Sequence, residues 1–114
     1  MEKVDNGSFR CSPGEQVTVI CRVSDPAVRV AGSWRGSASN FENDSAETDG
    51  TRTFTFIVRE NGALVLVPSF AASSAADATM RVFAQGADNV EHSAGGIARM
   101  SGVEEKMIAF EPVS

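Results

Sequence analysis

The feature that most constrains the fold of this chain is a two-residue alternation of apolar side chains. In residues 16–23 the apolar side chains of one parity are Val17, Val19, Cys21 and Val23. Residues 51–59 repeat the alternation with Phe54, Phe56 and Val58. Successive side chains of a β-strand point to opposite faces, so the pattern predicts half-buried strands. No segment has a sustained 3.6-residue period, and we therefore predict an all-β fold.

Shorter segments complete the predicted set of strands. They are residues 8–11, 28–34, 63–67, 79–85 and 105–111. Asn61-Gly62 separates residues 51–59 from residues 63–67, and Asn-Gly is the strongest short signal for a hairpin between two paired strands. Small residues dominate two of the segments between the predicted strands. We expect one helical turn within residues 70–78 and a long loop over residues 88–102.

Composition excludes several classes of function. The chain carries 10 Lys and Arg against 15 Asp and Glu, a net charge of -5, whereas a nucleic-acid-binding protein needs a basic surface. No apolar run reaches the length of a membrane-spanning helix, so we expect no membrane insertion. The first residues lack the apolar core of a signal peptide. The length of 114 residues is that of one domain, and we expect residues 1–114 to form it.

Residues 12–21, Ser-Pro-Gly-Glu-Gln-Val-Thr-Val-Ile-Cys, resemble a turn and strand of immunoglobulin-type domains. The resemblance implies a buried Cys21 with Trp34 packed on it from the next strand. The second cysteine of that family is missing, because Val82 or Phe83 stands at its position, and the chain has no tyrosine for the family's corner. We expect a single antiparallel β-sandwich of about seven to eight strands, immunoglobulin-like or jelly-roll.

The two cysteines leave two arrangements open. A tight turn at Pro13-Gly14 would pair Cys11 with Gln16 and would place Cys21 beyond the reach of a disulfide. A disulfide would require the first strand to leave this hairpin and pair elsewhere. The hairpin favours a buried Cys21 and a free Cys11.

Residues 40–50 form an acidic segment whose carboxylates and amides are of the kind that binds Ca²⁺. The candidate ligands are Glu42, Asp44, Glu47 and Asp49. Their spacing does not match an EF-hand, and a solvated acidic loop is the other interpretation. Apart from calcium we expect no cofactor.

His92 and the Trp34–Arg35 pair are candidates for a functional site, and each also has a structural interpretation. His92 stands beside Glu91 and Ser93, but no nucleophile elbow or phosphate-binding loop accompanies them. We therefore expect no enzyme activity and interpret His92 as an exposed loop residue. Trp34 and Arg35 end a predicted strand, where an exposed tryptophan could stack on a sugar ring. The parity of Trp34 with neighbouring valines favours the core instead.

The strongest functional signal is a set of apolar side chains with outward parity. If the alternating core residues face inward, the residues that face outward are Ile20, Ile57 and Phe83. Apolar side chains clustered on an outer face indicate a contact surface for a protein partner or for self-association. We expect a non-enzymatic binding or assembly module, on a cell surface or virus particle, that presents a sheet face or loops to a protein partner. The alternative is a small carbohydrate-binding, lectin-like domain assisted by calcium.

Overall fold

The computed structural model describes residues 1–26, 28–44, 50–69, 78–98 and 104–113, and for residues 37–44 the backbone alone. All regular structure in these ranges is β, which confirms the all-β part of the predicted fold class, whereas the sheet is closer to a barrel than to a clear two-sheet sandwich. The strands are β1 (Glu2–Asp5), β2 (Ser8–Cys11), β3 (Glu15–Val23), β4 (Arg29–Asp44), β5 (Thr51–Ser69), β6 (Thr79–Gln85), β7 (Glu91–Ala98) and β8 (Lys106–Pro112).

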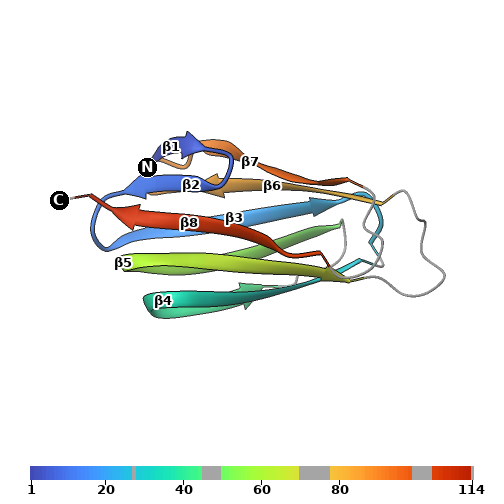
Figure 1. The fold of residues 1–114 in the computed structure, drawn as a ribbon, viewed down its shortest axis with the longest axis horizontal. Coiled ribbons are helices and arrows are strands. Elements are labelled where there is room, and N and C mark those ends of the chain that lie inside the picture. The colour runs from blue at the N-terminus through green and yellow to red at the C-terminus, as the bar shows by residue number, and fades with distance from the viewer. Residues whose placement is uncertain (27, 45–49, 70–77, 99–103, 114) are drawn as a thin grey trace.

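The strands form one continuous sheet in the order β1-β2-β8-β5-β3-β6-β7, and β4 also pairs with β5. Every pairing is antiparallel except that of β2 with β8. The sheet curls into a flattened, nearly closed barrel (Figure 1). Its two ends approach each other, because the rings of Phe9 on β2 and His92 on β7 lie 6.4 Å apart.

Strand β5 supplies two opposite walls of the barrel. Its 19 residues would extend about 60 Å as a straight strand, which exceeds the longest axis of the molecule, 47 Å. The strand must therefore bend. Residues 51–58 pair with β3, whereas residues 62–66 pair with β8. Figure 1 shows β4 and β5 doubling back together at the end of the barrel that holds both termini.

The hairpin predicted at Asn61-Gly62 is wrong. The two segments that flank this motif are the two halves of β5, and both halves pair with β4 rather than with each other. Gly62 is opposite Gly36, and a Cβ at Gly62 would collide with the Trp34 ring and the Arg35 carbonyl. The motif therefore marks a bend at which two backbones and an indole ring come close together.

Other boundaries also differ from the sequence analysis. The predicted strand at residues 28–34 is the first part of β4, which continues to Asp44 through much of the predicted acidic loop. Residues 91–98 form β7 within the predicted long loop. This edge strand lacks apolar alternation, and its pairing with β6 shifts register at a bulge. The predicted helical turn falls almost wholly outside the described residues.

The core joins both halves of β5 through aromatic rings. Phe56 lies with its ring centroid 4.4 Å from Trp34 and 5.1 Å from Phe110 of β8. Phe9 stacks on Phe110 at 5.6 Å. The phenylalanine rings are fully buried, while Trp34 is half-buried at the margin of the core. Offset and edge-to-face ring contacts of this kind stabilise a core beyond the area they bury.

The turn at residues 12–15 forms as predicted, but its flanking strands do not pair. Glu15 N donates to the Ser12 carbonyl at 3.0 Å, and Gly14 has a φ of 79°. Pro13 followed by a glycine at positive φ is typical of a type II turn. Strand β2 leaves the turn to pair with β8 in parallel, whereas β3 pairs with β5 and β6. Of the two arrangements that the sequence left open, the structure has the one in which the first strand pairs elsewhere.

The buried carboxylate of Glu15 holds two turns together. Its Oε1 accepts from Ser12 N and its Oε2 from Ala87 N, each at 2.8 Å. The Met1 ammonium lies 3.5 Å from Oε2. Burial alone would raise the pKa of Glu15, but the two backbone donors and the ammonium outweigh it and lower the pKa below its usual 4.5.

Phe56→Ala should lower the free energy of unfolding by about 3–5 kcal/mol, because it empties a site between Trp34 and Phe110. Urea unfolding followed by circular dichroism measures this. Phe83→Ala is the matched control, since Phe83 faces outward on the same sheet and is half-buried. Equal losses for the two variants would contradict the central role of the Phe56 contacts.

Glu15→Gln should lower stability at pH 7 by about 1–3 kcal/mol, because a buried charge-assisted acceptor is lost. The folded-state pKa of Glu15 is depressed, so its contribution is full above the unfolded-state pKa near 4.5 and disappears as pH falls through the folded-state value. The stability difference between wild type and variant should therefore shrink below about pH 4.5. A difference that stays constant from pH 7 to pH 3 in urea titrations would refute this account.

Candidate functional site

The three predicted contact residues all point outward, and the structure brings two of them together. Ile20, Ile57 and Phe83 are each half-buried on the outer side of the sheet. Ile20 lies directly opposite Phe83 in the β3–β6 pairing. Ile57 is opposite Gln16 instead, four residues along β3, which is about 13 Å away. The predicted contact face is therefore an Ile20–Phe83 pair, with Ile57 apart from it.

Arg22 lies beside the Ile20–Phe83 pair and contacts both Phe83 and Glu91. Its guanidinium carbon lies 4.8 Å from the centroid of the Phe83 ring, and its Nη1 donates to Glu91 Oε1 on β7 at 2.8 Å. A cation over a ring face is attracted to the ring's quadrupole. The two contacts hold Arg22 across three strands, so this polar group has a defined position beside the apolar pair.

A depression of about 720 Å³ lies beside Phe83 along the β6–β7 pairing. Arg81, Phe83 and Ser93 contribute side chains to its wall, and Gly95 and Gly96 contribute backbone. Glycine is required here for two reasons. Gly95 has a φ of 84°, and a Cβ at Gly96 would collide with the carbonyl of Met80. The bulge in β7 thus leaves a hollow where a regular strand would carry side chains.

We call the surface formed by Ile20, Arg22, Arg81, Phe83, Glu91 and Ser93 the β3–β6–β7 face. Sequence analysis found only Ile20 and Phe83 among its members. The others depend on β7, whose place beside β6 no apolar period indicates. The adjacent glycines at 95 and 96 were the one available signal.

Trp34 and Arg35 do not form a common platform. The Trp34 ring packs inward against Phe56 and Phe110, whereas Arg35 is exposed. Consecutive strand residues point to opposite faces, so the two side chains diverge. The Trp34 Nε1 is buried and has no hydrogen-bond partner among the described residues.

His92 does not lie in a loop, and that interpretation is wrong. It is opposite Ala84 in the β6–β7 pairing, and its ring lies near Phe9 where the ends of the sheet approach. Its Nε2 is buried without a hydrogen-bond partner in the described part of the chain. The inward parity of this edge strand, which the sequence pattern does not reveal, places the imidazole at the seam of the barrel.

Both cysteines are buried and unbridged. Strand β2 does pair away from β3, which is the condition that a disulfide would require. The cysteines nevertheless stay unbridged, and the Cys11 thiol lies 3.8 Å from the Glu111 carbonyl. Burial and the nearby Glu15 carboxylate raise the pKa of Cys11 to about 11. Burial raises the pKa of Cys21 to about 12, although the Arg52 charge acts to lower it.

Arg52 is a buried charge that the sequence analysis did not single out. Its side chain is inward and only 2% exposed. Nη2 donates to the carbonyls of Pro26 and Val28 at 3.1 and 3.0 Å, and Nη1 donates to that of Thr51 at 3.2 Å. These bonds hold the connection between β3 and β4 against β5, which is a structural role.

The calcium prediction falls largely outside what the structure describes. Glu42 and Asp44 lie on β4, opposite Thr55 and Thr53, but their side chains are not described. Residues 47 and 49, the other two candidates, lie outside the described ranges. Within those ranges no cluster of three or more His, Cys, Asp or Glu side chains is placed to hold a metal ion. The calcium site stays a prediction.

Comparison of the chain with protein-family models, with curated proteins and with solved structures found no match. In the part of the chain that the structure describes, no helix is long and apolar enough to cross a membrane. The functional argument therefore depends on the geometry of the chain's own surfaces.

Ellman's reagent at pH 8 should leave both thiols unmodified in the native protein and should modify two per chain after unfolding without reductant. Burial and a raised pKa leave little exposed thiolate at either position. Cys11→Ser is the matched control and should release one thiol. Recovery of no thiol from the unfolded wild type would mean that the cysteines are bridged.

Proposed function

We propose that the protein is a non-enzymatic binding module that contacts a protein partner through the β3–β6–β7 face. The observation that carries this proposal is the adjacency of Ile20 and Phe83, two large apolar side chains on the outer side of central strands. Outer-face positions of a curved sheet are free to be polar. Clustered apolar residues there are typical of a contact surface.

The neighbours of this pair support the same conclusion. Aromatic and arginine side chains are enriched in protein interfaces, and here Phe83 is flanked by Arg22 and Arg81. The depression beside Phe83 offers a receptor for a partner side chain. Its glycine-lined floor exposes backbone groups that can hydrogen-bond to the partner.

As part of this proposal we regard the flattened barrel as related to the immunoglobulin-type sandwich. The type II turn at residues 12–15 leads into β3, which carries the buried Cys21, and the Trp34 ring packs at the margin of the core. Modules of that architecture bind through sheet faces and loops, and the β3–β6–β7 face is the sheet face proposed here.

A carbohydrate-binding module is the second candidate, with a different platform from the one first expected. Phe83 lines the depression together with the polar side chains of Arg81 and Ser93. A ring beside hydrogen-bonding groups can stack on a sugar and bind its hydroxyls. A glycan array with and without Ca²⁺ distinguishes this candidate from a protein-binding face.

The sedimentation of the wild type and of an Ile20→Thr, Phe83→Thr double variant tests the self-association form of the proposal. Each buried apolar side chain lost from an interface removes roughly 1.5–3 kcal/mol, which is tenfold or more in affinity. Threonine suits a strand, so the double variant should stay folded. Ile57→Thr is the matched control, because Ile57 has similar burial on the same side but lies apart from the pair.

We expect the double variant to dissociate and the Ile57 variant to associate like the wild type. Equal weakening by both variants would contradict a site centred on Ile20 and Phe83. A wild type that remains monomeric at high concentration would exclude self-association and leave a different protein as the partner.

A further inference from the structure

The sheet has three edge strands, and two of them are interrupted. Strand β1 has four residues and a register shift between Lys3 and Asp5, and β7 contains the bulge near Gly95. Short strands and bulges are devices that prevent a further strand from pairing with an edge. Strand β4 pairs only with β5 among the described strands. Its first half, residues 29–36, follows β5 without a register shift.

Of the usual protections against a further strand, the edge at residues 29–36 has only its charged outward side chains, Arg29 and Arg35. It extends about 26 Å, contains no proline, and directs no charged side chain inward. Its inward residues are Val30, Gly32 and Trp34, and its outward residues are Arg29, Ala31, Ser33 and Arg35, all exposed. Among the described strands, none pairs with the backbone groups on this side of residues 29–36.

We propose that the free edge of β4 at residues 29–36 accepts an extended segment of an acidic protein partner as an additional antiparallel strand. Main-chain hydrogen bonds would provide affinity, and side chains on alternate positions would provide specificity. This inference does not depend on the β3–β6–β7 face, which lies on the opposite wall of the barrel.

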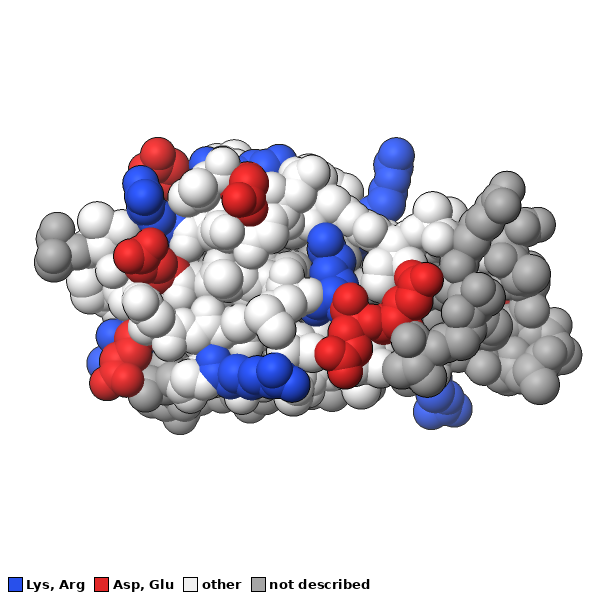
Figure 2. Space-filling view, viewed as in Figure 1, with Lys and Arg blue, Asp and Glu red and all other residues white. Residues whose placement is uncertain are grey.

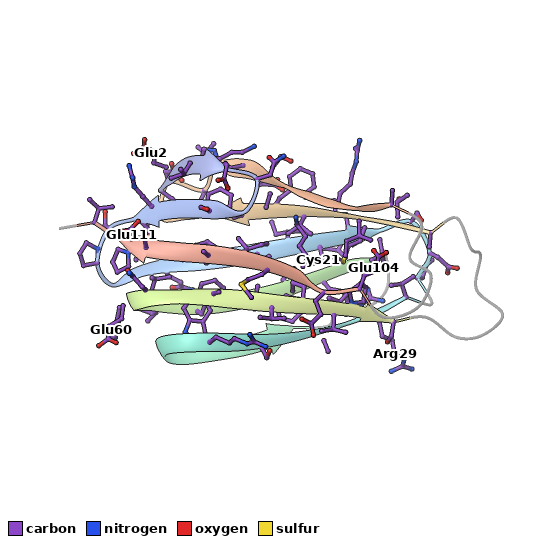
Figure 3. The ribbon with its side chains drawn as sticks, viewed as in Figure 1. Glu2, Cys21, Arg29, Glu60, Glu104 and Glu111 are labelled. Atoms are coloured by element: carbon purple, nitrogen blue, oxygen red, sulfur yellow. The ribbon has the colours of Figure 1, made fainter. Side chains whose placement is uncertain are left out.

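Charge identifies the partner as acidic. Arg29 and Arg35 both face outward and neither forms an ion pair with a described residue. They stand six residues apart, about 20 Å along the strand. Figure 3 shows Arg29 pointing away from the barrel. An antiparallel strand opposite them would place two of its side chains, also six residues apart, beside these guanidinium groups.

The residues between the two arginines suit an extended partner. Ala31 and Ser33 are small, and they lie opposite Val67 and Val65 of β5. The partner's central side chains would therefore lie beside small residues of β4, which leave room for them. On the face that Figure 2 shows, basic and acidic side chains are scattered over the surface, including near its middle.

The same charges disfavour a second copy of this chain as the occupant. A symmetric antiparallel pairing of two β4 edges centred on Gly32 would place Arg29 of one copy opposite Arg35 of the other. Like charges directly opposite each other destabilise a strand pair. The arginines thus act against self-pairing and in favour of a carboxylate-bearing strand.

The test uses a fluorescent peptide of about seven residues, with glutamate at both ends and alternating valine and threonine between them, and the full protein. We expect saturable binding that weakens with salt, and slower hydrogen exchange of amides in residues 29–36. An Arg29→Glu, Arg35→Glu double variant should bind at least tenfold more weakly. Lys3→Glu, a charge reversal on the exposed strand β1 at the far edge of the sheet, is the matched control and should bind like the wild type.

Several results would overturn the proposal. These are the absence of peptide binding to the folded wild type, equal binding of a peptide with lysine at both ends, and equal weakening by Lys3→Glu. Slower exchange confined to β6 and β7 would assign the peptide to the other wall. Dimers of the wild type that protect residues 29–36 would replace the acidic partner with a second copy.

Discussion

The bend shared by β4 and β5 is the constraint on which the rest of the structure depends. Because β5 doubles back, a single strand provides Phe56 to one wall and Leu64 to the other, and both side chains are fully buried. The contact between Phe56 and Phe110 then joins the two walls through the core. Gly62 permits this bend because it has no Cβ to collide with Trp34. A straight β5 would leave half of its apolar residues without a core.

Two buried charges stabilise opposite ends of the barrel. Glu15 accepts backbone hydrogen bonds from the turns at one end, and Arg52 donates to backbone carbonyls at the other. Each replaces the lost hydration of its charge with fixed backbone dipoles, which is how a charged side chain is tolerated in a protein interior. The depressed pKa of Glu15 shows that its partners outweigh the cost of burial. The strands between these ends are therefore held as a stable frame for their outer surfaces.

That frame presents two surfaces of different character on its two walls. The β3–β6–β7 face offers apolar side chains, a framed arginine and a hollow beside Phe83. The edge at residues 29–36 offers backbone groups between two outward arginines. A partner of the first surface must match its shape, whereas a partner of the second must supply an extended backbone and carboxylates. The two surfaces lie on opposite walls, so each proposal can be tested without altering the residues of the other.

The sequence by itself determined the local structure: most strands, the type II turn at residues 12–15 and the outward parity of Ile20, Ile57 and Phe83. These depend on neighbouring residues, through side-chain alternation and the conformational freedom of glycine. Only the tertiary structure decided which strands pair. Asn61-Gly62 is compatible with a hairpin or with a bend. The turn after Cys11 is compatible with pairing of β2 to β3 or to β8. Strand pairing depends on contacts between residues far apart in the chain, and the local alternation of side chains carries no information about these contacts. For that reason β7, the inward His92, the β6–β7 depression and the free edge of β4 could not be predicted.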